Sequence, residues 1–235
     1  MLNTLALAYT FMFDYPELTT EAIDGMRFYK TPTGEYFPSV TTVLGNTIPE
    51  EKSQALKKWA NAIGQVKAKS VTQAAADRGT AVHLMIERHL NGETPFSHGE
   101  FEQAWVNSFN ALKIKLKSIN EIWCQEKALF STTLGMAGRV DCIGLYKGEE
   151  AIIDFKTSSK LKSQKDIEDY RLQLTAYSIM HNEMFGTNIN KGIILMTSDA
   201  GFPQEFSVDL TNYVNPLCDR ITEFYKKKMD IDWSF

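Results

Sequence analysis

Two aspartates and a lysine lie in a short stretch of the sequence whose residue types could carry out phosphodiester hydrolysis. Residues 138–156 read GRVDCIGLYKGEEAIIDFK, with Asp141 in one apolar run and Asp154 and Lys156 at the end of the next. Hydrolysis drives hydroxide towards a centre surrounded by negative oxygens, so a divalent cation must polarise the phosphate and lower the pKa of the attacking water. Mg2+ is typically held by one or two protein carboxylates, with water and substrate phosphate completing its shell. Asp141 and Asp154 could supply those carboxylates.

Lys156 is expected on the same side of its strand as Asp154, because side chains alternate with period two. Phe155 is then expected to point to the other side and into the core. Beside a reacting phosphate, Lys156 could stabilise developing charge. It could also act as a base if burial and a metal lower its pKa from about 10.4.

Both carboxylates lie in segments that are typical of β-strands, residues 139–146 and 151–156, which are rich in Val, Ile and aromatic residues. Between the segments, residues 146–149 have the glycine and polar residues of a tight hairpin turn. Because a hairpin pairs its strands antiparallel, the two aspartates can meet across neighbouring strands. We expect Arg139 to point away from Asp141, in a solvated or structural role.

A G-x-x-D followed by a D-x-K also occurs by chance, and its bland interpretation is two strand-end carboxylates with a solvated lysine. Two flanking segments favour the functional interpretation. Residues 78–87 indicate a helix with His83 on or near its apolar stripe. Residues 166–185 indicate another helix, with Gln173 one turn before Tyr177. The polar residues therefore follow one another as His, G-x-x-D, D-x-K and Q-x-x-x-Y.

This order of motifs resembles the RecB-like branch of the PD-(D/E)XK nuclease superfamily. The resemblance extends from about residue 27 to about residue 197. Residues 36–44, followed by Trp59 and by Arg78-Gly79-Thr80, are similar to the mitochondrial and phage-encoded members in particular. Such a resemblance implies a divalent-metal-dependent nuclease.

The resemblance also implies how the metal is held. It assigns a Mg2+ or Mn2+ ion to His83, Asp141, Asp154 and the backbone carbonyl of Phe155. Glu126, on the strand before the hairpin, is a weaker match to an acidic position of the family, where it would hold a second metal or a water. The plain alternative for Glu126 is an ordinary solvated strand residue.

The remaining matched positions are implied to act on the substrate. Lys156 would orient or activate the attacking water. Gln173 and Tyr177 would brace the site and contact DNA. Lys160 and Lys162 follow the catalytic triplet, where a phosphate backbone would have to pass.

An aromatic residue with nearby lysines suits single-stranded DNA, because bases stack on aromatic faces and the backbone follows positive charge. Trp59, in a lysine-rich predicted helix, is the DNA-binding candidate of this type. The net charge of −4 does not by itself indicate a nucleic-acid binder.

The predicted fold class is α/β, with a PD-(D/E)XK restriction-endonuclease-like core of mixed β-sheet flanked by helices and a mainly helical N-terminal lobe. We expect one nuclease domain over residues 1–235, with a hairpin and helical lobe in 1–118 and the catalytic sheet in 119–235. The expected helices and strands are a hairpin at 27–37, helices at 52–90 with a break and 100–118, strands at 122–130, 139–146, 151–156, 192–197 and 205–208, and a last helix from 211.

The number of cysteines, three, limits which cofactors the protein could hold. An iron–sulfur cluster of the kind found in some RecB-like nucleases needs four thiolates, so none is expected. Widely spaced cysteines fit a reducing cytosol. The sequence has no run of 18 apolar residues, and we expect no signal peptide. We therefore expect a cytoplasmic protein without membrane partners, in the host cytoplasm if phage-encoded.

These patterns together predict a DNA exonuclease acting on single strands or free ends in replication, recombination or repair. A structure-selective endonuclease on the same fold is one alternative. A catalytically silent DNA-binding or adaptor protein is another, although such proteins generally lose the lysine or an aspartate. Hydrolysis of RNA stays open, since nothing in the sequence indicates recognition of the 2′-hydroxyl.

Overall fold

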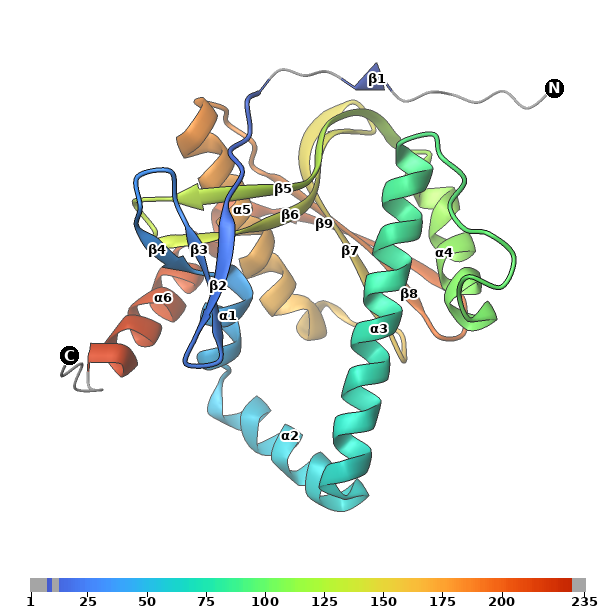
Figure 1. Cartoon of the computed structure of the whole chain (residues 1–235), viewed down its shortest axis with the longest axis horizontal. Helices are drawn as coiled ribbons and strands as arrows, with labels where there is room; N and C mark the ends of the chain where they lie inside the picture. The colour runs from blue at the N-terminus through green and yellow to red at the C-terminus, as the bar shows by residue number, and fades with distance from the viewer. Residues whose placement is uncertain (1–7, 10–12, 230–235) are drawn as a thin grey trace.

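A mixed six-stranded sheet forms the centre of the protein (Figure 1). The computed structural model describes residues 8–9 and 13–229. The sheet has the order β1-β5-β6-β7-β8-β9. Its strands are β1 (Ala8–Tyr9), β5 (Ile119–Ser131), β6 (Met136–Tyr146), β7 (Glu149–Ser158), β8 (Lys191–Ser198) and β9 (Pro203–Asp209). The β1/β5 and β7/β8 pairs are parallel and the others antiparallel, so the predicted mixed sheet is confirmed.

Helices cover both faces of this sheet, as expected for an α/β core. One apolar cluster joins one face to α1 (Val40–Asn46), α5 (Glu168–Phe185) and α6 (Val214–Met229). The other cluster joins the opposite face to the second half of α3 (Gln65–Leu90) and to α4 (Gln103–Leu116). Short 3-10 turns at Gln164–Ile167 and Leu210–Tyr213 precede α5 and α6.

A small sheet lies against β6 of the central one. It contains β2 (Thr19–Ile23), β3 (Met26–Lys30) and β4 (Tyr36–Pro38), and the predicted hairpin is its β3–β4 pair. Ser39 forms an isolated bridge with Ala137 of β6 and caps α1 by accepting from the Thr42 N–H. This bridge brings β3 and the start of α1 beside the strand that carries Asp141. Helix α1 and strand β2 were not predicted from the sequence.

The α2 helix (Glu50–Ile63) and the first half of α3 form a V that projects away from the sheet (Figure 1). The V turns at Gly64, whose φ of 87° lies in the region that favours glycine, and this is the predicted helix break. No residue of α2 is buried, and Lys52 pairs with Asp169 of α5. Within the described ranges, none of the helices is both long and apolar enough to span a bilayer.

A buried aromatic cluster packs beside β5 around His181 of α5, which has no exposed surface. Its ring contacts Phe13 and Phe185, and its two nitrogens lie 3.1 Å from the Tyr15 hydroxyl and 2.8 Å from the Thr187 hydroxyl. Burial lowers the pKa of His181 from 6.5 to about 4. The folded protein therefore holds this imidazole neutral at neutral pH.

The pKa of His181 predicts a loss of stability in weak acid. The unfolded chain binds the proton more tightly, so the free energy of unfolding should fall as the pH drops from about 6.5 towards about 4, by on the order of 3 kcal/mol. Urea unfolding at several pH values would measure it. The control variant His98→Phe, at an exposed position, should show the wild-type dependence of the free energy of unfolding on pH. His181→Phe should lose the part of that dependence that comes from His181. Equal profiles for both variants would contradict the prediction.

Candidate functional site

The predicted hairpin opens at its aspartates. The antiparallel β6–β7 ladder runs from the Tyr146–Glu149 pair to the Cys142–Ile153 pair and ends there. Asp141 and Asp154 are the next residue on each strand. Beyond that point β6 continues beside β5 and β7 continues beside β8. The two carboxylates therefore lie where the strands part, and the backbone groups freed by the separation become available to side chains.

The backbone of Phe155 uses both of its freed groups to hold the site. Its N–H donates to Asp141 Oδ2 at 2.9 Å, and its carbonyl accepts from His83 Nε2 at 2.8 Å. Because a carbonyl can only accept, Nε2 must carry a proton and Nδ1 is the atom left to bind something else. The Phe155 ring packs in the α3 and α4 core, as predicted.

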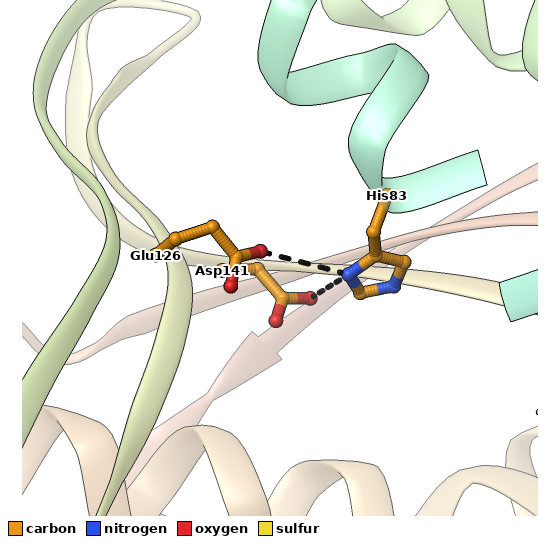
Figure 2. A group of neighbouring side chains, drawn as sticks. All are labelled: His83, Glu126 and Asp141. Carbon is orange, nitrogen blue, oxygen red and sulfur yellow. Dashed lines mark ion pairs between the residues drawn. The ribbon is translucent and has the colours of Figure 1, made fainter. Parts of the chain in front are cut away.

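His83, Glu126 and Asp141 converge on one point between α3, β5 and β6 (Figure 2). His83 Nδ1 lies 3.8 Å from both Glu126 Oε1 and Asp141 Oδ2. Potential ligand atoms of the three residues lie within 4.8 Å of one another. One imidazole nitrogen and two carboxylates make a donor set suited to a divalent cation with a preference for oxygen.

Glu126 reaches this point through a strained backbone. Its φ of 50° is in the left-handed region, which costs a residue with a side chain roughly 1–2 kcal/mol. Non-glycine residues in this conformation persist where the surrounding structure imposes it, and they cluster at functional sites. The strain favours the functional interpretation of Glu126 over that of an ordinary strand residue.

Two substitutions at Glu126 separate strain from charge, since Glu126→Ala and Glu126→Gly both remove the carboxylate. In an ordinary strand the alanine variant is the more stable, by roughly 0.5–1 kcal/mol. At Glu126 we expect the glycine variant to be the more stable by about 1 kcal/mol, because only glycine relieves the left-handed strain. Urea unfolding of the two variants measures the difference, and a more stable alanine variant would contradict it.

The buried Asp154 forms an ion pair with the partly exposed Lys156 beside the three converging residues. Lys156 Nζ donates to Asp154 Oδ1, while Asp154 Oδ2 is buried and has no hydrogen-bond partner among the described residues. The lysine ammonium also lies 5.2 Å from the ring centre of Tyr170. Leaving a buried carboxylate oxygen unpartnered is costly, so this oxygen is poised to receive a cation or a water.

The charges of the site shift the pKa values of its members. Burial raises the pKa of Asp154 to about 6, although Lys156 lowers it. Burial lowers the pKa of Lys156, but Asp154 and Asp141 raise it more, so the lysine stays charged. Burial lowers the pKa of His83, but Asp141 and Glu126 raise it to about 9. The neighbouring carboxylates thus favour the charged form of Lys156.

Gln173 and Tyr177 come together on α5 as their spacing predicts, with Gln173 Nε2 3.4 Å from the Tyr177 hydroxyl. Gly138 makes room for the tyrosine. A Cβ at position 138 would lie 2.8 Å from Tyr177 Cε1 and 3.3 Å from Val40 Cγ2. The glycine of the G-x-x-D motif is therefore a packing requirement, which we did not predict from the sequence.

A cavity of about 350 Å³ connects these residues. His83, Glu126, Asp141, Lys156, Gln173 and Tyr177 line it together. Arg139 lines the same cavity, so the expectation that it points away from Asp141 is wrong. The two residues are two positions apart on one strand, and this spacing returns a side chain to the same side. Arg27 of β3 also lines this cavity and was not predicted either.

The other predicted DNA-binding residues lie outside this cavity. Trp59 is 40% exposed on α2. Lys160 and Lys162 follow β7, and Lys162 lines a separate hollow of about 400 Å³ with Lys52 and Arg220. Their roles stay predictions.

Comparison with characterised proteins finds relatives that are named nucleases. The chain is 28% identical over 204 residues to mitochondrial genome maintenance exonuclease 1 of Xenopus tropicalis, covering 81% of this chain and 58% of the relative. The predicted resemblance is confirmed. The mouse and human proteins of the same name are 27% and 25% identical over 173 residues, covering 71% of this chain and 51% and 50% of the relatives. The chain thus spans between half and three-fifths of the length of these proteins.

The chain was also compared with protein-family profiles and with solved structures. No protein-family profile matches the chain. A solved protein from Eubacterium rectale, provisionally named an exonuclease, aligns with a TM-score of 0.46 at 14% identity, covering 65% of each chain.

Proposed function

We propose that the protein is a divalent-metal-dependent DNA exonuclease that acts on single strands or free ends. The observation that carries the proposal is the convergence of His83, Glu126 and Asp141 beside the ion pair of Asp154 and Lys156. Relatives named exonucleases support the reaction class. A role in replication, recombination or repair, whether in a phage or in a cell, is part of the same proposal.

The residues present fit a metal. His83 Nδ1, Asp141 and Glu126 would hold it, and the unpartnered Oδ2 of Asp154 is the next available oxygen. The Phe155 carbonyl accepts from His83 and keeps a second lone pair. Mg2+ or Mn2+ bound here would polarise a phosphate and acidify a water.

The protein side chains would divide the remaining work. Lys156, held charged by Asp154, would stabilise negative charge developing on the phosphate. Tyr177, whose pKa burial raises, would stay protonated and with Gln173 offer hydrogen-bond donors on the cavity wall. His83 would keep its Nε2 proton on the Phe155 carbonyl and thereby keep Nδ1 aimed at the carboxylates.

The test is a cleavage assay with end-labelled linear single-stranded DNA. Purified protein should degrade it with Mg2+ or Mn2+, and EDTA should stop the reaction. A covalently closed single strand distinguishes exonuclease from endonuclease, because only an endonuclease cuts it. The same strands made of RNA test the sugar preference. Binding to DNA without cleavage in either metal would overturn the proposal in favour of a silent DNA-binding protein.

A further inference from the structure

Two arginines share the cavity with the acidic residues of the candidate site. Arg27 comes from β3 and Arg139 from β6. Their strands are held together by the Ser39–Ala137 bridge and by the Ser39 N–H, which donates to the Arg27 carbonyl at 2.9 Å. The arginines thus come from two sheets whose junction lies at the cavity wall.

The guanidinium groups keep most of their donors available. Arg139 is exposed, and within the described part of the chain it makes no hydrogen bond or ion pair, although its charge acts on Glu87 and it lines the same cavity as Glu126. Arg27 is also exposed. Its Nη2 donates to Thr41 Oγ1 at 2.9 Å, and its guanidinium lies 5.9 Å from the centre of the Tyr29 ring.

Lys156, which also lines the cavity, is engaged by Asp154. An arginine presents five donors in a planar fork that matches phosphate oxygens. A DNA strand that places one phosphate at the acidic residues must place its other phosphates along the walls. Those phosphates need positive partners, since the protein carries a net charge of −4.

We propose that Arg27 and Arg139 form a phosphate subsite that holds a phosphate of the substrate strand other than the one being cleaved. This inference rests on the proposed nuclease function. That second phosphate is either the neighbouring linkage of the strand or a phosphate at its end. The subsite binds the strand and takes no part in the chemistry, so its loss raises KM more than it lowers kcat.

The test compares Arg27→Gln and Arg139→Gln with the control Lys226→Gln, which removes one charge from an exposed position of α6. End-labelled single-stranded DNA is cleaved at a series of salt concentrations. Each arginine variant should raise KM roughly tenfold or more. It should also make log(kcat/KM) depend less steeply on log[salt], by about 0.7 for each lost phosphate contact. The control should match wild type.

Modified strands identify the phosphate. A single neutral methylphosphonate linkage beside the cleaved bond should raise the KM of wild type as much as the Arg139→Gln substitution does. The same linkage should add little to the KM of the Arg139→Gln variant. If instead removing a terminal phosphate weakens cleavage by wild type and adds little to the loss in Arg139→Gln, the subsite holds the strand end. Arginine variants that behave like Lys226→Gln while wild type cleaves DNA would overturn the subsite alone. A wild-type protein that cleaves neither DNA nor RNA would overturn the proposed function itself.

Discussion

Cleavage of end-labelled single-stranded DNA by Asp154→Asn should be at least roughly a thousandfold slower than by wild type. Asn keeps the size of the side chain and an oxygen for Lys156, so the fold should survive. It removes the negative charge from the buried Oδ2, which has no partner among the described residues. A divalent cation at the site would lose a ligand of opposite charge.

The control for this variant is Asp219→Ala, an exposed aspartate of α6. It should cleave at the wild-type rate. The reaction rate at saturating Mg2+ or Mn2+ is the quantity to compare, with the unfolding transition of each variant measured alongside. A cleavage rate of Asp154→Asn within tenfold of the wild-type rate would show that the carboxylate is not needed for the reaction. The pair of Asp154 and Lys156 would then have only a structural role.

Lys156→Met should be both inactive and unstable. The methionine keeps much of the apolar stem, but both oxygens of Asp154 are then without a partner in the protein interior, where the carboxylate is 2% exposed. Removing one member of a buried pair typically costs 3–5 kcal/mol. We expect about 2–4 kcal/mol, because Asp154, whose pKa is already about 6, can take up a proton. Urea unfolding at neutral pH measures the loss.

The double variant Asp154→Asn/Lys156→Met separates stability from catalysis. It removes both charges together, and replacing a buried ion pair by neutral groups is often neutral or stabilising. Its free energy of unfolding should therefore recover most of what Lys156→Met loses, while cleavage stays absent. Additive losses in the double variant would show that the two residues do not interact energetically.

The sequence was sufficient to predict the hairpin and its polar residues because their patterns are local. Alternation along β6 and β7, the glycine turn and the i,i+4 spacing of Gln173 and Tyr177 all act over a few residues. Asp154 and Lys156, which were predicted on the same side of their strand, meet for the same reason. Local spacing also accounts for the break between α2 and α3, where Gly64 stands.

Features set by distant parts of the chain could not be predicted in this way. Glu126 carries a left-handed backbone without the glycine or asparagine that usually signals one. The bridge between Ser39 and Ala137, which places Arg27 near the site, joins residues nearly a hundred positions apart. Nor does any short pattern reveal that β6 and β7 separate beyond the Cys142–Ile153 pair, on the side of Asp141 and Asp154, because this depends on their other neighbours, β5 and β8.

The main chain of Phe155 gives the site a form of mutational robustness. Asp141 and His83 are both anchored by the peptide groups of this one residue, through its N–H and its carbonyl. Every amino acid except proline provides both groups, so the side chain at position 155 is free to change with the core that it fills. Evolution could thus repack the apolar interior behind the site without disturbing the orientation of the residues in front of it.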